Sequence, residues 1–219
     1  MKKVKVTYNN EDYYVIDNSD DTKDYVTLLK KEPLTYDELI TYKGDLSSDY
    51  FKLSNGYGYA NYYYNSDDCY PLGLNEHNIP DVSTGCSTNY NTSYVKTVID
   101  NWSNNKINSE HLVTVNGYKA RLLNVDELLD KLGYDKDYIY TDDVYRLTDS
   151  APSWLYDGHY EYWTMSSVHD SNKVLYYISS DGMIFGFNTS EGCGKSCVYS
   201  KNVIRPVINI KKCAIDGTC

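Results

Sequence analysis

The stretch KVLYYISSDGMIFGF, residues 173–187, decides the fold class because it has the pattern of two strands joined by a tight turn. Asp181-Gly182 is the strongest short hairpin signal in the chain, and aromatic and β-branched residues flank it on both sides. A two-residue turn at this point predicts three cross-strand pairs: Ile178 with Phe185, Tyr176 with Phe187, and Tyr177 with Gly186. The C-terminal third of the chain is therefore predicted to be a β-sheet.

Further strands are predicted on both sides of this hairpin, from alternating or β-branched runs. They are Val4–Thr7, Tyr13–Asp17, Tyr25–Leu29, Tyr118–Leu122, Glu161–Ser166 and Val203–Ile210. Asn9-Asn10 lies between the first two runs as a turn, which indicates an opening hairpin. Pro206 lies inside the last run, and because proline cannot donate a ladder hydrogen bond, it predicts an edge strand or a bulge there.

Two helices follow from their capping residues and their apolar spacing. Thr35 with Glu38 three residues later is a capping box, which predicts a helix from Tyr36 to about Tyr42. A second helix is predicted to start near Thr92 or Ser93, because apolar residues follow at helical spacing. They are Val95, Val98, Ile99 and Trp102.

A third helix is predicted between an Asn124 cap and Gly133, with leucines on its apolar face. Residues 44–90 show no sustained period and are expected to be a loop-rich stretch. Strands, then helices, then a closing sheet indicate an α+β fold, with a mixed, mostly antiparallel sheet, two or three helices and long loops. Residues 1–219 are expected to form a single domain.

The charge of the chain argues against two classes of partner. Its formal net charge is −10, with 31 acidic and 21 basic residues among 219. A surface of this sign repels the phosphates of nucleic acids and of anionic lipids, so no nucleic-acid partner is expected. The sequence has no run of about 18 apolar residues, so no segment is expected to span a membrane.

Six cysteines fall into three groups of near neighbours: Cys69 with Cys86, Cys193 with Cys197, and Cys213 with Cys219. An even number in such groups is typical of disulfides, although the sequence does not fix their connectivity. Free thiols and a metal site are the alternatives, but the Cys193-Cys197 spacing suits zinc poorly and no histidine lies near it. Disulfides form in oxidising compartments, so the chain is predicted to be extracellular or at the cell surface, as a segment of a longer protein. No metal and no other cofactor are expected.

Tyrosine is unusually frequent, with 26 copies against three phenylalanines. Tyrosine combines a rigid apolar ring with a hydrogen-bonding hydroxyl, which is the chemistry of adaptable binding surfaces. Many of these tyrosines are nevertheless expected on half-buried strands, where the residue fits a pleated surface well.

Three elements follow one another in the C-terminal third: Tyr162-Trp163-Thr164-Met165-Ser166, the hairpin around Asp181-Gly182, and Val203-Ile204-Arg205-Pro206-Val207-Ile208. This order resembles a family of uncharacterised extracellular bacterial domains, common in Firmicutes of the gut. Its members have a Tyr-Trp or Trp-Trp strand, an aromatic hairpin and a closing Val-Arg-Pro-Val-Ile strand. The likeness covers most of residues 90–212 and, more loosely, the whole chain.

The family is similar to the C-type-lectin-like fold of formylglycine-generating enzymes and of the variable proteins of diversity-generating retroelements. The resemblance thus implies a C-type-lectin-like domain in which the first and last strands meet, which brings Val4–Thr7 near Val203–Ile210. The calcium-binding lectin motifs Glu-Pro-Asn and Trp-Asn-Asp are absent from the sequence. Fold alone does not determine function, so the resemblance carries no activity by itself.

An enzymatic alternative starts from the cysteines. Formylglycine-generating enzymes use a close pair of cysteines late in the chain, and Cys193 with Cys197 is such a pair. The spacing differs by a residue, that enzyme's other segments have no counterpart here, and Lys195 is the only nearby cation that would lower a thiol pKa. A loop-closing disulfide is therefore expected, and the chain is predicted not to be an enzyme.

The candidate binding residues form an aromatic group in the C-terminal half: Trp154, Tyr156, His159, Tyr160, Tyr162, Tyr176 and Phe187. Rings of this type suit both sugar faces and protein hot spots. The predicted function is a non-catalytic recognition module that binds protein or glycan through this Tyr-rich face. The alternative is a structural or spacer domain of a cell-surface protein. Exposed, concave rings favour the first function and buried rings favour the second.

Overall fold

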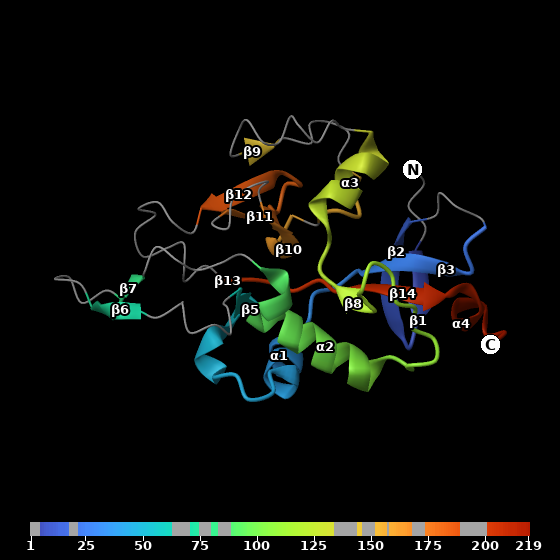
Figure 1. The fold of residues 1–219 in the computed structure, drawn as a ribbon, viewed down its shortest axis with the longest axis horizontal. Helices are drawn as coiled ribbons and strands as arrows, with labels where there is room; N and C mark the ends of the chain where they lie inside the picture. The colour runs from blue at the N-terminus through green and yellow to red at the C-terminus, as the bar shows by residue number, and fades with distance from the viewer. Residues whose placement is uncertain are drawn as a thin grey trace.

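The computed structural model describes a set of segments that together make a layered α+β structure (Figure 1). They are residues 5–17, 22–62, 71–74, 80–82, 89–133, 144–145, 152–156, 158–167, 174–188 and 201–219. Within them, four helices accompany four sheets, and the pairs between named strands are antiparallel. The predicted α+β class with mostly antiparallel sheets is confirmed. None of the helices in these segments has the length and apolar character that crossing a bilayer requires.

The largest sheet joins the two ends of the chain. Its strands, in spatial order, are β1 (Lys5–Tyr8), β2 (Glu11–Asp17), β3 (Tyr25–Lys30), β14 (Val207–Lys211) and β8 (Ala120–Arg121). β1 and β2 form the predicted opening hairpin. Asn9 and Asn10 take φ angles of 51° and 62° at its turn, which asparagine tolerates and a type I′ turn requires.

Two predictions about the last strand are wrong. β14 starts directly after Pro206 and lies between β3 and β8 instead of at an edge. Pro206 needs no ladder donor there, and its carbonyl accepts the N–H of Lys30 at 2.8 Å. β1 and β14 share the sheet, but β2 and β3 lie between them, so the first and last strands do not pair. The predicted strand over 118–122 is shortened to β8.

α1 (Tyr36–Tyr42) begins with the predicted capping box. The Thr35 hydroxyl accepts the backbone N–H of Glu38 at 3.2 Å, and the Glu38 carboxylate accepts the backbone N–H of Thr35 at 2.8 Å. Leu34 and Leu39, on either side of the cap, are both buried in the core. The cap therefore fixes the start of the helix and the direction from which the chain enters it.

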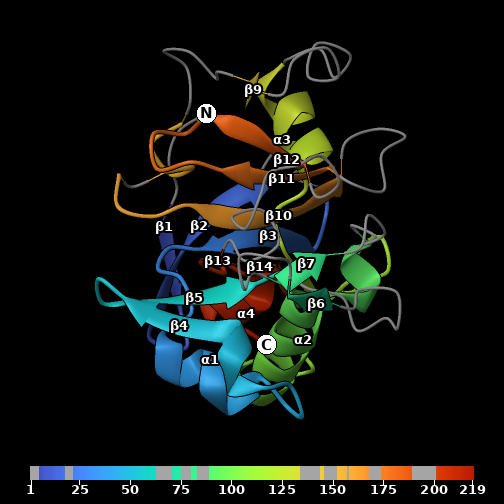
Figure 2. The same ribbon diagram turned by 90° about the vertical axis from the view of Figure 1, so that its left-hand side faces the viewer.

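α2 (Tyr94–Lys106) lies beside α1 (Figures 1 and 2). Its cap is Ser93, as predicted, and its buried face includes the four predicted apolar residues: Val95, Val98, Ile99 and Trp102. The side chain of Asn101 in α2 donates to the carbonyl of Tyr42 at 2.9 Å. This bond satisfies a carbonyl at the end of α1 that has no partner within its own helix.

A three-stranded sheet packs against α1, with the order β13 (Lys201–Asn202), β5 (Tyr57–Asn61) and β4 (Phe51–Ser54). Asn55 and Gly56, with φ angles of 50° and 81°, make a two-residue turn between β4 and β5. A Cβ at Gly58 would lie 2.6 Å from the backbone nitrogen of Tyr36, so β5 and α1 approach closely only because position 58 is glycine. This hairpin corrects the expectation of a loop-rich stretch over 44–90.

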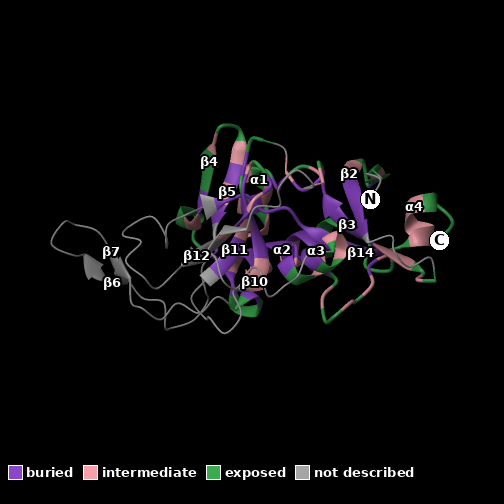
Figure 3. Ribbon diagram, turned by 90° about the horizontal axis from the view of Figure 1, so that it is seen from above, coloured by how far each residue is buried: buried purple, intermediate pink, exposed green. Residues whose placement is uncertain are grey.

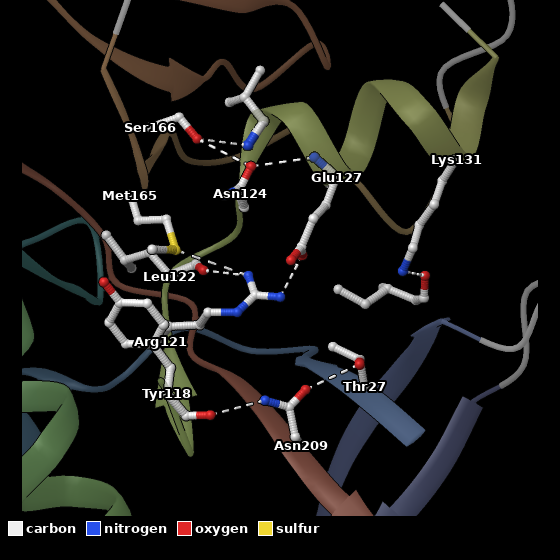
Figure 4. Close-up of polar contacts among 12 residues, drawn as sticks. Thr27, Tyr118, Arg121, Leu122, Asn124, Glu127, Lys131, Met165, Ser166 and Asn209 are labelled. Carbon is white, nitrogen blue, oxygen red and sulfur yellow. Dashed lines mark hydrogen bonds and ion pairs between the residues drawn. The ribbon is translucent and has the colours of Figure 1, made fainter. Parts of the chain in front are cut away.

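α3 (Val125–Leu132) begins and ends at its predicted caps (Figure 4). The Asn124 side chain accepts the backbone N–H of Glu127 at 3.2 Å, and a left-handed glycine ends the helix. Buried Arg121 of β8 forms an ion pair with Glu127. Ser166 accepts the first helical N–H at 2.8 Å. These bonds connect α3 to the five-stranded sheet through Arg121 and to the strand β10 (Tyr162–Ser167) through Ser166.

The second sheet has the order β10 (Tyr162–Ser167), β11 (Val174–Ile178), β12 (Ile184–Asn188) and β9 (Val144–Tyr145). The remaining elements are short. They are β6 (Pro71–Leu74), β7 (Pro80–Val82), α4 (Lys212–Asp216), and the 3₁₀ turns Ser48–Tyr50 and Tyr90–Thr92.

The aromatic hairpin of β11 and β12 forms where it was predicted, but its register is shifted by one residue. Gly182, with φ 83°, closes a three-residue loop: its N–H donates to Ser179 O at 3.0 Å, and the Ser179 N–H donates to Met183 O at 2.8 Å. A turn that ends in a left-handed glycine has this geometry. The observed pairs are Ile178 with Ile184, Tyr177 with Phe185, Tyr176 with Gly186, and Leu175 with Phe187. The rings of Tyr177 and Phe185 consequently stack, with centroids 5.5 Å apart.

The buried apolar side chains of the described segments form two clusters, and Figure 3 colours the buried parts of the ribbon purple. The larger includes Trp102 of α2 and Leu28 of β3. The second includes Leu129 of α3, Ile178 of β11 and Trp154. Figure 2 shows the corresponding layers, with α3 and the second sheet at one end, α1 and α2 at the other, and the five-stranded sheet between them. The second cluster carries the candidate site.

Candidate functional site

The structure places the seven predicted binding residues in different environments. Four are buried in the second cluster: Trp154 at 2% exposure, Tyr160 at 3%, Tyr162 at 0% and Tyr176 at 4%. His159 is exposed and Tyr156 is half-buried. Phe187 lies in β12, and its side chain is outside the described part of the chain. The described rings therefore do not form an open stacking platform, and most of them belong to the framework.

Residues 152–156 form a turn that sets Trp154 into the core. The N–H of Leu155 donates to the carbonyl of Pro152 at 2.8 Å. The Tyr162 hydroxyl donates to Leu155 O at 2.6 Å, and the Tyr160 hydroxyl donates to Lys31 O at 3.2 Å. Two of the tyrosines predicted to bind a ligand therefore use their hydroxyls to bind the protein's own backbone.

This turn and the residues just after it contact the loop of the aromatic hairpin. The N–H of Gly158 donates to the carbonyl of Ser180 at 3.0 Å. A Cβ at Gly182 would lie 2.6 Å from Cδ1 of Tyr156, so the ring of Tyr156 rests directly on the hairpin glycine. The half-buried Tyr156 is therefore held in place by the hairpin.

A cavity of about 170 Å³ lies beside this turn. Its wall consists of Tyr14, Lys31, Glu32, Ser153, Trp154, Tyr156, Tyr160 and Arg205. Three of the predicted binding residues, Trp154, Tyr156 and Tyr160, are thus brought together in one concave wall. Ser153 belongs to the same turn, and the other wall residues come from β2, from the segment after β3, and from the segment before β14.

Arg205 is the buried charged residue of this wall. Its guanidinium donates to the carbonyls of Lys30 at 3.1 Å, Leu155 at 3.1 Å and Trp154 at 3.2 Å. Its Cζ also lies 4.8 Å from the centre of the Tyr162 ring, a cation–π distance. Arg205 therefore joins the end of β3 to the 152–156 turn and fixes one side of the cavity.

The remaining charges near the site are carried by exposed or half-buried groups. Lys31 Nζ lies 2.9 Å from a carboxylate oxygen of Glu32, and this hydrogen bond raises the pKa of Lys31. Next to the hairpin, partial burial and then the Asp181 charge raise the pKa of Glu161. Burial, helped by Glu161 and Asp181, raises the pKa of Tyr177 to about 12. The cavity wall thus carries a net positive charge, whereas the hairpin end is acidic.

Five residues of the cavity wall were not predicted from the sequence: Tyr14, Lys31, Glu32, Ser153 and Arg205. The sequence does carry one signal for Arg205, because an arginine lies inside the apolar run 203–208, where a charge is unusual. Lys31 and Glu32 have no such signal, since charged pairs in a connecting segment are common.

One of the three expected disulfides falls on described residues. Cys213 and Cys219 lie at disulfide-bonding distance, with Cα atoms 4.9 Å apart, which confirms this pair. Cys69, Cys86, Cys193 and Cys197 lie outside the described residues. Across the described segments, no three side chains of His, Cys, Asp or Glu come together in a way that would hold a metal ion.

Comparison of the chain with protein-family models, with curated proteins and with solved structures finds no match. The function proposed below therefore depends on the geometry of the site.

Proposed function

We propose that this chain is a non-catalytic recognition module of a secreted or surface bacterial protein, with a C-type-lectin-like arrangement. It binds a protein or glycan ligand through the Tyr-rich part of its C-terminal half. The observation that carries the proposal is the cavity of about 170 Å³ walled by Trp154, Tyr156 and Tyr160. A concave site with aromatic walls and a few convergent polar groups is typical of ligand binding.

The surroundings of the cavity support this function because hydrogen bonds and strand pairing join them. The wall residues belong to the 152–156 turn, to β2, and to the segments before β10, after β3 and before β14, and internal hydrogen bonds hold these parts together. A preorganised site loses little conformational entropy when a ligand binds. The disulfide between Cys213 and Cys219 supports a location in an oxidising compartment.

A second candidate function, a structural or spacer domain, has an observation of its own. Trp154, Tyr160, Tyr162 and Tyr176 are buried, and rings in this position stabilise the core whether or not a ligand exists. The two functions differ in the cavity: a spacer needs no accessible cavity at this place, whereas a recognition module does.

The experiment is an array of immobilised glycans and peptides, probed with the wild-type chain and with two variants. Ser153 is exposed at the cavity wall, so Ser153→Trp would fill the entrance without disturbing a buried residue. Lys52→Trp, at an exposed position in β4, is the matched control because it adds the same ring outside the cavity wall.

The proposal predicts ligands that bind the wild-type chain and Lys52→Trp but not Ser153→Trp. Ligands that bind all three proteins equally would place recognition elsewhere. An array without any bound ligand would favour the spacer function.

A further inference from the structure

Arg205 is a buried cation whose partners are all uncharged. It is 2% exposed, and its three hydrogen bonds go to backbone carbonyls. Within the described segments it forms no ion pair with a carboxylate. A charge removed from water without a counter-charge is unfavourable, and such charges in proteins are usually paired.

The Arg205 guanidinium also has more N–H donors than these three hydrogen bonds use. It carries five N–H groups in a planar fork, and the three bonds use Nε–H and one N–H each on Nη1 and Nη2. One N–H on each of the two terminal nitrogens has no partner in those bonds. Two neighbouring N–H groups of a guanidinium match the two oxygens of a carboxylate.

The other charges of the wall cancel each other. Lys31 and Glu32 form an ion pair with their charged atoms 2.9 Å apart, and their side chains are 39% and 57% exposed. Glu32 is the one carboxylate among the wall residues, and it is engaged with Lys31. The charge that remains at the cavity is that of Arg205.

The size of the cavity and the exposure of its rings limit the occupant. A volume of about 170 Å³ lies below the range of roughly 300–1,000 Å³ typical of sites for whole small molecules, so one side-chain-sized group fits. Trp154, Tyr160 and Tyr14 are buried, so they offer no open ring face on which a sugar could stack. A slender group on an extended chain suits this cavity better than a sugar ring does.

We propose that the cavity binds a carboxylate of a protein partner, either an acidic side chain or a chain end, and that Arg205 provides its counter-charge. This inference rests on the proposed recognition function and names its ligand class. Because the whole chain carries a net charge of −10, it repels dense acidic tracts at long range, so the partner presents an isolated carboxylate.

The test is calorimetric titration of the full chain with small probes. The probes are N-acetyl-glutamate amide for a side-chain carboxylate, N-acetyl-alanine for a chain end, N-acetyl-glutamine amide as the neutral control of the same shape, and glucuronic acid as a sugar carboxylate. We expect at least one of the two amino-acid carboxylates to bind at least about tenfold more tightly than the glutamine amide, the scale of a lost charge-assisted hydrogen bond. Equal binding by the glutamine amide, or preference for glucuronic acid, would overturn the inference.

Three variants and the Lys52→Trp control locate the binding. Arg205→Lys keeps the charge but loses the planar fork, and we expect the affinity to fall about tenfold or more. If this variant does not fold, the other two still decide. Ser153→Trp should abolish binding while Lys52→Trp leaves it unchanged. Glu32→Gln should raise the affinity by up to about fivefold, because it removes a like charge from the wall. Weaker binding by Glu32→Gln would contradict the inference.

Failure of the inference and failure of the proposed function give different results. If array ligands bind the cavity but no carboxylate probe binds at tens of millimolar, the ligand class is wrong and the recognition function stands. If neither the array nor the probes show binding that Ser153→Trp removes, both are wrong.

Discussion

Position 182 requires glycine for two reasons, its backbone conformation and its contact with Tyr156. Its φ of 83° lies in the left-handed region, and a Cβ would meet the ring of Tyr156 at 2.6 Å. Gly158 and Gly56 have φ angles of 84° and 81°, but a Cβ at either position would meet nothing within 4 Å. The three glycines therefore separate the cost of backbone strain from the cost of steric contact.

We expect Gly182→Ala to destabilise the fold more than Gly158→Ala or Gly56→Ala. Each substitution carries a strain of about 1–2 kcal/mol for a Cβ in the left-handed region, and only Gly182→Ala must also displace Tyr156. Urea unfolding of the three variants measures the difference. Equal losses of stability would mean that Tyr156 does not rest on this turn.

Arg205 is predicted to matter for stability as well as for binding. Arg205→Met keeps much of the side-chain volume but leaves the carbonyls of Lys30, Trp154 and Leu155 without this donor. At about 1 kcal/mol or more for each buried group left without its donor, the expected loss is on the order of 2 kcal/mol, because Leu155 O keeps the Tyr162 hydroxyl as a donor.

Denaturant unfolding measures this loss, and Lys52→Met at an exposed position is the control, with an expected change within about 0.5 kcal/mol. A loss for Arg205→Met as small as that of the control would show that the carbonyls of Lys30 and Trp154 are satisfied in another way.

Helix caps are the elements that the sequence predicts best, because capping chemistry is confined to a few neighbouring residues. Thr35 with Glu38 and Asn124 with Glu127 predict helix starts that the structure confirms. We expect Thr35→Ala to cost about 1 kcal/mol, since it removes the hydroxyl that accepts the Glu38 N–H. Thermal unfolding measures this cost, and Thr35→Ser, which retains the hydroxyl, should restore most of it. No difference between alanine and serine would contradict the cap.

The turn length and register of hairpins were predicted less well than the helix caps, as two turns show. Asn55-Gly56 and Asp181-Gly182 look alike in sequence, yet the first makes a two-residue turn and the second closes a three-residue loop. The ring of Tyr156 lies on the second turn, so a contact between distant segments accompanies the difference in register. Local sequence does not contain that contact.

The candidate site could be predicted only in part for the same reason. Trp154, Tyr156 and Tyr160 lie close together in the sequence, and the structure brings them into one wall. Lys31 and Arg205 join that wall from opposite ends of the chain, through the pairing of β3 with β14. The aromatic residues in the sequence indicated where the cavity lies. The charged residues of its wall could not be predicted, because only the tertiary structure brings them there.

At the scale of the whole molecule, the many tyrosines determine how the fold responds to alkali. Burial raises the pKa of Tyr13 and Tyr90, and it raises the pKa of Tyr94 and Tyr177 to about 12. The folded protein keeps these protons at a pH where the unfolded chain, with tyrosine pKa values near 10, has lost them. The unfolded state then binds fewer protons, so stability falls as the pH rises.

We therefore expect the free energy of unfolding to lose this contribution between about pH 10 and pH 12, ending in cooperative alkaline unfolding. Tyrosinate absorbance and circular dichroism followed together provide the measurement. Exposed tyrosines should titrate first, and the buried ones should titrate only as the fold is lost. A single ionisation step for all 26 tyrosines with the fold intact would contradict this prediction.

The central claim, that the cavity beside Trp154 is a binding site for a carboxylate, is tested most directly by nuclear magnetic resonance. The chain has three tryptophans, and the indole N–H of each gives its own signal. Trp154 lines the cavity, whereas Trp102 and Trp163 belong to the other buried cluster. During titration with N-acetyl-glutamate amide, the Trp154 signal should shift and saturate while the other two stay in place. A Trp154 signal that does not move, or three signals that move together, would contradict the claim.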